Sequence, residues 1–253
     1  MELDKVSFRY SKNKPLIESI SGIVPTGKIL CLIGPNGAGK STILQLMAGE
    51  LRPISGKVTI DGQQVFEMDI KKRAQKIAVA AQRNRLYDEM TVEDIVKTGR
   101  SPYHGTLATI SNGEIKPIIQ ETHLDKLVDK SINTLSRGQQ QRVWLAAAIA
   151  QDPDYLLLDE PTTYLDIHYQ AELMNLIKKL QKEHNLTVVM VLHDINQALK
   201  ISDEIWCIKN GQKVYDKAPM DLTNENILAD LFNSKIKVVN IPQYGPYVIQ
   251  IPE

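Results

Sequence analysis

Residues 34–41 read Gly34-Pro35-Asn36-Gly37-Ala38-Gly39-Lys40-Ser41. An apolar run at 28–33 precedes this stretch, and a run typical of a helix follows at 42–48. A strand, a glycine-rich loop and a helix in this order form the context in which G-x-x-x-x-G-K-[ST] binds phosphate. The glycines let the backbone wrap closely round an oxyanion, so that several N–H groups and a helix N-terminus point at the same phosphates. The stretch predicts a phosphate-loop α/β core that binds a purine nucleoside triphosphate.

Two side chains of this loop have predicted chemical roles. Lys40 is expected to reach the β- and γ-phosphates, and Ser41 is expected to bind Mg²⁺. A glycine-rich turn before an ordinary helix is the alternative, and the strand and helix on either side disfavour it. The expected phosphate contacts are Gly34, Pro35, Asn36, Gly37, Ala38, Gly39, Lys40, Ser41 and Thr42.

The composition is that of an ordinary globular protein. The chain has 253 residues, 43% of them hydrophobic and 24% charged, which suffices for one α/β core with a subdomain. The formal net charge is zero and the sequence has no long basic block, so sequence-independent nucleic-acid binding has little support. We interpret the cluster Lys71-Lys72-Arg73 as a solvated helix face.

Neither the N-terminus nor the cysteines indicate an exported or membrane-spanning protein. Residues 1–6 lack the basic start and apolar centre of a signal peptide, and the longest apolar runs are far shorter than the roughly 20 residues that span a bilayer. A soluble, cytoplasmic protein is expected. Cys31 and Cys207 lie in apolar, strand-like runs, which favours buried free thiols over a disulfide, a metal site or a nucleophile.

Other segments place strands and helices round this core. Alternation at 6–10 and a strand with a turn at 55–62 predict a small antiparallel sheet. Residues from about 83 to 152 lack strand runs, and Ser111 with Glu114 forms a capping box that opens a helix, so this stretch is predicted to be a helical insert.

The second half of the chain contains two short apolar runs that end in polar residues, at 155–160 and 186–193. Both are predicted to be buried parallel strands, whose polar carboxyl ends are where ligands of open α/β sheets bind. A helix at 194–201 and a strand with a turn at 204–211 should follow. Residues 235–252 are predicted to form a hairpin that turns at Tyr244-Gly245-Pro246.

The first of these strands ends in Asp159-Glu160, the expected partner of a phosphate loop. In such sites the first carboxylate meets Mg²⁺ and the second orients or deprotonates the attacking water. By themselves the two residues are weak evidence for such a site, because a strand that simply ends in a turn at Pro161 could have the same sequence.

Residues 135–142, Leu-Ser-Arg-Gly-Gln-Gln-Gln-Arg, precede a helical run at 143–150. Ser136 has an ordinary role here as the N-cap of that helix. It also has a functional one, in which a serine hydroxyl, glycine N–H groups and a helix dipole point at a phosphate. In this segment the chain resembles the ATP-binding-cassette ATPases, whose signature is Leu-Ser-Gly-Gly-Gln, and the resemblance covers nearly the whole chain.

The resemblance implies roles for single residues that would otherwise have plain interpretations. Tyr10 would stack on adenine, and is otherwise a surface strand residue. Gln82 would sense Mg²⁺ and the attacking water, and is otherwise a polar loop residue. Asp166, in the Leu165-Asp166 pair, would communicate across a dimer, and is otherwise a helix N-cap. His193 would contact the γ-phosphate, and Glu160 would act as the general base or water-orienting carboxylate.

The resemblance also implies one domain over residues 1–253 and a functional dimer. Residues of about 1–82 and 153–253 would form the RecA-like core with the β subdomain, and 83–152 the helical subdomain. Two chains would lie head to tail, each binding ATP with its phosphate loop. The signature residues of the other chain would complete each site: Ser136, Gly138 and Gln139. Asp159, Ser41 and Gln82 would hold Mg²⁺.

The chain departs from the family pattern at two positions. Arg137 replaces the first glycine of the signature, so its side chain must point away from the phosphate while Ser136 and the backbone donors remain. Ala81 stands where many relatives have proline before Gln82, which is expected to loosen that junction slightly.

Finer likenesses point to a class of transporter. The segments at 91–96, 99–105, 160–167 and 191–198 look like the ATPase subunits of bacterial importers for iron–siderophore, haem and vitamin B12, and 99–105 is similar to the ferric-hydroxamate branch. This implies a peripheral protein at the cytoplasmic face of the membrane. A multi-helix permease would dock near residues 83–105, and an extracellular binding protein would act indirectly.

Three other functions compete with import. Cassette proteins that remodel DNA or ribosomes usually carry two cassettes or a long coiled-coil insertion, and residues 42–134 leave room only for a short insert. An efflux ATPase is disfavoured by the importer-like segments and the absence of apolar spans. A small-molecule kinase would share the phosphate loop but would have no use for residues 135–142.

Overall fold

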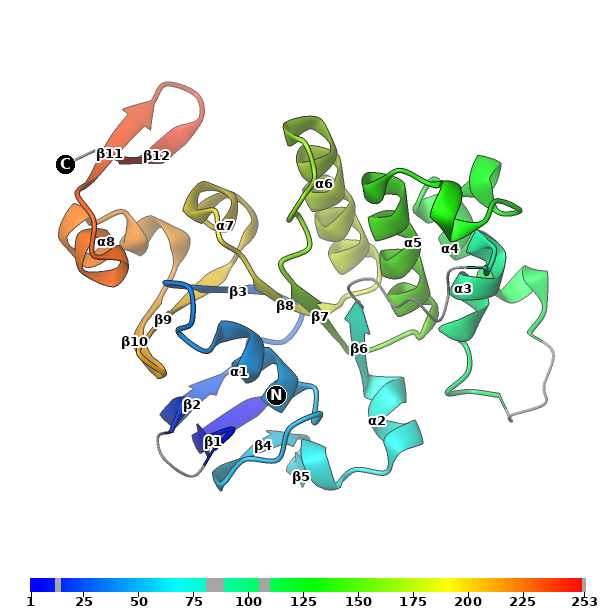
Figure 1. The fold of residues 1–253 in the computed structure, drawn as a ribbon, viewed down its shortest axis with the longest axis horizontal. Coiled ribbons are helices and arrows are strands. Elements are labelled where there is room, and N and C mark those ends of the chain that lie inside the picture. The colour runs from blue at the N-terminus through cyan, green and yellow to red at the C-terminus, as the bar shows by residue number, and fades with distance from the viewer. Residues whose placement is uncertain (12–14, 81–88, 105–109, 252–253) are drawn as a thin grey trace. The chain divides into compact units, whose positions relative to one another are not determined.

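The structure is a computed structural model that describes residues 1–11, 15–80, 89–104 and 110–251. The chain divides into two compact units (Figure 1). The first comprises Met1–Glu67 with Val189–Glu253, and the second comprises Met68–Val188. The first unit therefore contains the phosphate loop, and the second contains the signature segment.

A four-stranded antiparallel sheet forms one part of the first unit, in the order β2-β1-β4-β5. Alternation along β1 buries Leu3, Val6 and Phe8, which explains why this segment pairs as a half-buried strand. This is the small antiparallel sheet that the sequence predicts. Its strands are β1 (Glu2–Phe8), β2 (Ile17–Ile23), β4 (Ser55–Ile60) and β5 (Gln63–Gln64).

The other part of the first unit is built on β3, which is buried along its whole length. It pairs in parallel with β9, which pairs antiparallel with β10. With the end of β8, the strand order in this unit is β10-β9-β3-β8. The helices α1 and α7 follow β3 and β8 along the chain. The bounds are β3 (Ile29–Ile33), α1 (Lys40–Met47), β8 (Thr187–Val191), α7 (Ile195–Ile201), β9 (Glu204–Lys209) and β10 (Gln212–Lys217).

The second unit has the strand order β8-β7-β6, since β8 crosses the border between the units after Val188. β6 and β7 pair in parallel, and four of the five residues of β7 are buried. Of the predicted solvated face on α2, Lys71 and Lys72 are exposed, whereas Arg73 is half-buried. The bounds are α2 (Ile70–Lys76), β6 (Ile77–Ala80), β7 (Tyr155–Asp159) and α6 (Ile167–Glu183).

Helices make up the rest of the second unit. Residues 89–104 and 110–152 contain α3 (Val92–Thr98), α4 (Asn112–Glu121) and α5 (Arg137–Ala150), and no β-strand. Capping boxes begin all three helices, including the box predicted at Ser111 and Glu114. The boundaries predicted for a helical insert, 83 and 152, stay a prediction. The described ranges of the two units also contain the 3-10 turns η1 (Val65–Glu67), η3 (Asp125–Leu127), η4 (Ile132–Thr134) and η5 (Pro219–Leu222).

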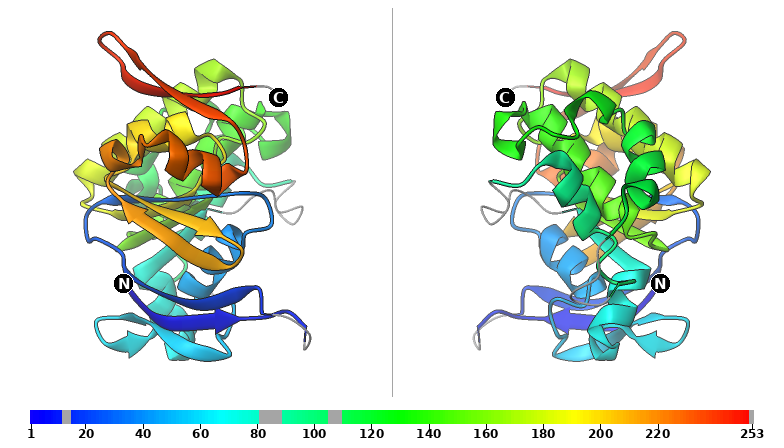
Figure 2. Two further views of the ribbon diagram at one scale, coloured as in Figure 1. Left: turned by 90° about the vertical axis from the view of Figure 1, so that its left-hand side faces the viewer. Right: turned by 90° about the vertical axis from the view of Figure 1, so that its right-hand side faces the viewer.

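The first unit ends in α8 (Glu225–Phe232) and a hairpin of β11 (Ile236–Ile241) and β12 (Gly245–Gln250), which extends beyond α8 in both views of Figure 2. The predicted hairpin exists, but the prediction that it turns at Tyr244-Gly245-Pro246 is wrong. Ile241 pairs with Gly245, so the loop is 242–244. Tyr244 N–H donates to the Ile241 carbonyl at 3.0 Å, and Gln243, with φ 68°, is the third residue of that turn, where a type II turn requires positive φ.

Among the helices of the described ranges, none combines the length and the apolar character needed to cross a membrane. Both cysteines are buried free thiols, as predicted, and burial raises the pKa of Cys207 to about 12.

Candidate nucleotide-binding site

The phosphate loop connects the end of β3 to the start of α1. Gly34 has φ 146°, and a Cβ there would lie 1.9 Å from the carbonyl oxygen of Ile208 on β9. Gly37 has φ 76° with open space around it, and Gly39 has φ 99°. Position 34 therefore requires glycine both for its conformation and for the close approach of the two backbones, whereas position 37 requires it for conformation alone.

Lys40 is the charged centre of the loop. Its side chain is 5% exposed, and Nζ donates to the carbonyl oxygens of Gly34 at 2.8 Å and Pro35 at 2.9 Å. Burial of an ammonium is costly unless acceptors or anions compensate it. The loop's own carbonyls hold this cation inside the curve of the backbone, so a phosphate that enters meets a positive charge already in position.

The N-terminus of α1 adds donors to this cation. Gly39 is the N-cap and provides no side-chain hydrogen bond, so the first N–H groups of the helix are not capped by that residue. Such N–H groups, together with the helix dipole, attract anions. Ser41 lies in the same turn and is half-buried. The loop therefore has the charge and the donors that a polyphosphate requires.

Tyr10 lies beside the same helix. Its hydroxyl is 3.2 Å from Thr42 Oγ1 and donates to Gln45 Oε1 at 3.1 Å. Its ring meets Phe8 edge to face at 4.9 Å between centroids, and the residue is 64% exposed. An exposed ring fixed next to the phosphate-loop helix suits a stacking partner for a base, and the stacking itself stays a prediction.

His193 follows β8 in the first unit and is exposed. The preceding residue, Leu192, donates its N–H to the carbonyl of Leu32 at 3.2 Å, which ties this segment to the strand that leads into the phosphate loop. Asp194 then caps α7, as its carboxylate accepts from the N–H of Asn196 at 2.8 Å.

The paired carboxylates lie in the second unit. Asp159 is the last residue of β7, and both it and Glu160 are half-buried. Glu160 has φ 49°, a left-handed conformation that a residue other than glycine adopts at a cost. Its carboxylate accepts from Thr163 Oγ1 at 3.2 Å, and its carbonyl accepts from Thr163 N–H at 3.1 Å. The backbone thus turns sharply at Glu160 and holds its carboxylate over the following turn.

The signature segment begins α5. Ser136 is the N-cap: its hydroxyl accepts from Gln139 N–H at 3.3 Å, and Gln139 Oε1 accepts from Ser136 N–H at 3.0 Å. This confirms the ordinary capping role of Ser136. A Cβ on buried Gly138 would lie 3.1 Å from the ring of Tyr169, so this glycine lets α5 approach α6 closely.

Arg137, the departure from the signature, stacks on a residue that the sequence analysis missed. Its guanidinium lies 5.2 Å from the ring centroid of Tyr164, within cation–π range. Tyr164 lies in the turn between Glu160 and α6, and Asp166 ends that turn as the N-cap of α6, with its carboxylate accepting from Tyr169 N–H at 3.0 Å. The only hint of this contact in the sequence was an arginine in the signature segment and a tyrosine in the segment after Glu160.

The predicted residues thus divide between the units. The first unit brings Tyr10, His193 and the whole phosphate loop into one compact body. The second unit contains the carboxylates, the signature residues and the Asp166 cap: Asp159, Glu160, Ser136, Gly138, Gln139 and Asp166. Gln82 and Ala81, and with them the predicted Mg²⁺ and water sensor, lie outside the described residues.

Ser41 and Asp159, the described residues predicted to bind Mg²⁺, both carry oxygen donors. Mg²⁺ prefers hard oxygen ligands and commonly binds through one or two protein oxygens plus substrate phosphates. Ser41 of the first unit has a hydroxyl oxygen and Asp159 of the second unit a carboxylate, and their joint use for Mg²⁺ stays a prediction. The described residues contain no group of three His, Cys, Asp or Glu side chains that could hold a metal by themselves, and an ion bound largely by phosphates does not need one.

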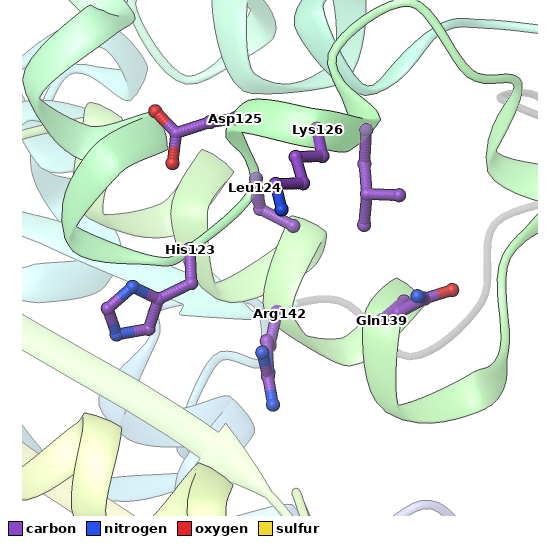
Figure 3. A pocket seen from close by; sticks show the side chains of 7 residues that line it. His123, Leu124, Asp125, Lys126, Gln139 and Arg142 are labelled. Atoms are coloured by element: carbon purple, nitrogen blue, oxygen red, sulfur yellow. The ribbon is translucent and has the colours of Figure 1, made fainter.

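A separate pocket of about 360 Å³ adjoins the signature helix. Figure 3 shows the segment from His123 to Lys126 on one side of it and Gln139 with Arg142 on the other. Arg142 forms an ion pair with Glu172. This pocket belongs to the second unit, so it is distinct from the phosphate loop of the first.

The chain is similar to known proteins over most of its length. The family model described as "ABC transporter" matches residues 17–163. The petrobactin import ATP-binding protein YclP of Bacillus subtilis is 38% identical over 242 residues, with 95% of this chain and 96% of YclP covered. The iron(3+)-hydroxamate import ATP-binding protein FhuC of the same organism is 35% identical, with 91% and 87% covered.

A solved structure is also similar. The dimeric structure of MJ0796, a bacterial ABC transporter cassette, superposes with a TM-score of 0.73 at 27% identity. The match covers 86% of this chain and 98% of MJ0796. The fold class that the sequence predicts is therefore confirmed.

Proposed function

Because this chain belongs to the ABC transporter family, we propose that it is the ATP-hydrolysing subunit that powers import of a metal chelate. The seating of the Lys40 ammonium within the phosphate loop carries the nucleotide part of this proposal. The chelate part rests on relatives named for petrobactin and iron(3+)-hydroxamate import that cover at least 91% of the chain. An iron–siderophore complex is the first choice of cargo, with haem and vitamin B12 as alternatives.

ATP would bind with its phosphates in the loop of residues 34–42 and its base against Tyr10. Lys40 and the N–H groups at the start of α1 neutralise the β- and γ-phosphates. Ser41 and Asp159 would hold Mg²⁺, with Gln82 as a further ligand. When bound, the ion neutralises developing negative charge on the phosphate oxygens.

Glu160 is the proposed general base. It accepts a proton from a water molecule as the water oxygen bonds to the γ-phosphorus and the bond from that phosphorus to the β–γ bridging oxygen breaks. ADP and phosphate are the products. His193 would donate a hydrogen bond to the γ-phosphate and Gln82 would orient the water. The hydrogen bond from Thr163 to the carboxylate of Glu160 supports this role, since it restrains the side chain.

A second copy of the chain would complete each site. Ser136, Gly138 and Gln139 of one chain would contact the phosphates bound to the loop of the other, and Asp166 would lie at the seam. The dimeric structure of the similar cassette MJ0796 supports dimerisation. ATP would hold the two copies closed, and hydrolysis would release them, so that a permease with different affinity for the two states is driven between conformations.

We infer a peripheral position at the cytoplasmic face of a bacterial membrane. A multi-helix permease would dock on residues 83–105, of which 89–104 are described, and an extracellular binding protein would deliver the chelate to it. An efflux ATPase or a cassette that does not transport is the alternative. Purification of tagged protein from solubilised membranes decides between them: a siderophore- or B12-type permease in the eluate supports import, and a ribosomal or DNA-bound complex contradicts it.

The substitution Glu160→Gln tests the enzyme. We expect it to retain ATP binding, to accumulate an ATP-bound dimer and to lose steady-state turnover, measured by phosphate release and by light scattering coupled to size-exclusion chromatography. Glu183→Gln is the matched control, because Glu183 makes only a 3.9 Å surface ion pair with Lys179. Fast steady hydrolysis by Glu160→Gln would overturn the assignment.

The substitution Lys40→Ala tests the phosphate loop itself. It removes a charge-assisted contact to phosphate, so nucleotide affinity should fall. The measurement is the dissociation constant of a fluorescent ATP analogue, with exposed Lys178→Ala as the control. Equal affinity in Lys40→Ala and the unsubstituted protein would count against the phosphate-loop interpretation.

A further inference from the structure

Arg137 and Tyr164 form a contact between the two segments of the second unit that the proposed function places at the dimer seam. Arg137 is the first residue of α5, directly after the N-cap Ser136. Tyr164 lies in the turn before α6, is 81% exposed and has φ 66°. The planar guanidinium of arginine suits stacking on an aromatic face. At 5.2 Å from the ring centroid, the guanidinium joins the start of α5 to the turn before α6, across 27 positions in the sequence.

This pair is one of three contacts within the chain that join α5 to α6 or to the turn before α6. Farther along α5, Gly138 packs against the ring of Tyr169 on α6, and Arg142 forms an ion pair with Glu172 on α6. These inner contacts fix the two helices to each other. The Arg137–Tyr164 contact adds a third one, between the first residue of α5 and the turn that precedes α6.

The turn that holds Tyr164 has a conformation that needs support from its surroundings. Glu160 and Tyr164 both adopt positive φ, 49° and 66°, although neither is glycine. Such conformations persist where neighbouring structure holds them. Hydrogen bonds inside the turn hold part of it: Leu165 N–H donates to the Thr162 carbonyl at 3.2 Å. The stack holds the tyrosine side chain, which these backbone bonds do not reach.

We propose that the Arg137–Tyr164 stack is a positioning pair that fixes the signature segment and the turn before α6 as one surface, and thereby favours closure of the ATP-bound dimer. The inference rests on the proposed function. Ser136 directly precedes Arg137 and Asp166 follows Tyr164 by two residues, so the stack restrains the spacing of the two segments before a second copy docks. Surface cation–π contacts correspond to about a two- to fivefold change in an equilibrium constant.

The expected consequence is specific to dimerisation. Neither residue belongs to the phosphate loop, so the affinity of a single chain for ATP should not change. The association constant of the ATP-bound dimer should fall about two- to fivefold when either partner of the stack is removed, because the open arrangement of the two segments then competes with the closed one.

The experiment is a double-mutant cycle in the Glu160→Gln background, in which hydrolysis cannot obscure dimerisation. Arg137→Gln removes the charge and retains a long side chain, and Tyr164→Leu removes the ring and retains an apolar side chain. Tyr164→Phe is the matched control, because it keeps the ring. Sedimentation velocity with saturating MgATP gives the dimer association constant, titration with a fluorescent ATP analogue gives the affinity of the single chain, and circular dichroism confirms folding.

The proposal expects each single variant to weaken association about two- to fivefold, the double variant to be no weaker than the weaker single variant, and Tyr164→Phe to match the background. Additive effects in the cycle, or a Phe variant as weak as the Leu variant, would overturn it. If the Glu160→Gln background itself forms no dimer with ATP, the proposed function fails instead, and the two failures are thereby distinguished.

Discussion

Replacement of Gly34 by alanine should destabilise the first unit strongly, even in the absence of nucleotide. The added Cβ would lie 1.9 Å from the carbonyl oxygen of Ile208 and 3.0 Å from its carbonyl carbon. Both atoms belong to the backbone of β9, which pairs in parallel with β3, so neither can move as a flexible side chain would. The φ of 146° adds a conformational cost, because residues with a Cβ rarely adopt it.

The expected cost follows from these two terms. A strained backbone conformation contributes about 1–3 kcal/mol and overpacking about 1–3 kcal/mol. The lower entropy of alanine in the unfolded chain offsets about 0.4–1 kcal/mol. The sum is a loss of about 1–5.5 kcal/mol in the free energy of unfolding, which corresponds to a fall of roughly 2–20 °C in the melting temperature at this chain length.

Gly37→Ala in the same loop is the matched comparison. Its φ of 76° is also positive, but an added Cβ would meet nothing within 4 Å. Only the conformational cost of about 1–2 kcal/mol applies, and the entropy term offsets part of it. The expected loss is about 1 kcal/mol or less, or roughly 2–3 °C.

Thermal unfolding of the full chain without nucleotide, followed by circular dichroism and by calorimetry, compares the two variants. A Gly34→Ala protein that melts within 2 °C or so of Gly37→Ala would refute the argument from close approach. It would mean that β3 and β9 can separate at little cost, so the phosphate loop would not be held by its neighbouring strand.

Three further predictions concern stability and reactivity. Burial, with Asp216 beside it, raises the pKa of Glu204, so this group contributes stability below its unfolded pKa that is lost as pH rises through the folded value. Glu204→Gln should therefore gain stability relative to the unsubstituted protein as the pH of urea titrations rises from below the unfolded pKa through the folded pKa of Glu204, and a difference independent of pH would contradict this. Burial also raises the pKa of the thiols Cys31 and Cys207, so iodoacetamide should label neither until urea unfolds the chain, as read by mass spectrometry; rapid native labelling would disprove it. Thr91→Ala removes the N-cap of α3 and should lower the free energy of unfolding by about 1 kcal/mol, whereas Thr91→Ser should retain most of that stability. Equal melting temperatures of the two variants would argue against the cap.

Structural features that depend on a few neighbouring residues could be predicted from the sequence. The apolar run before Gly34 and the helix after it have the periodicity and glycine spacing of a strand, loop and helix, and the structure has β3 and α1 there. Ser111 and Glu114 predict the start of a helix because the hydrogen bonds of a capping box join residues within one helical turn. The hairpin turn was predicted two residues too far along, because glycine and proline at 245 and 246 suggested a turn, whereas Gly245 pairs with Ile241 and is already part of β12.

The sequence by itself determined the family, the phosphate loop, the carboxylate pair and the signature, since these depend on residue type and order over a few positions. Only the tertiary structure decided that Gly34 lies against Ile208, that Tyr10 bonds to the helix after the phosphate loop, and that Arg137 stacks on Tyr164. Each of these contacts joins residues that are distant in the chain. Their geometry is set by how strands and helices pack, which no local pattern of side chains records.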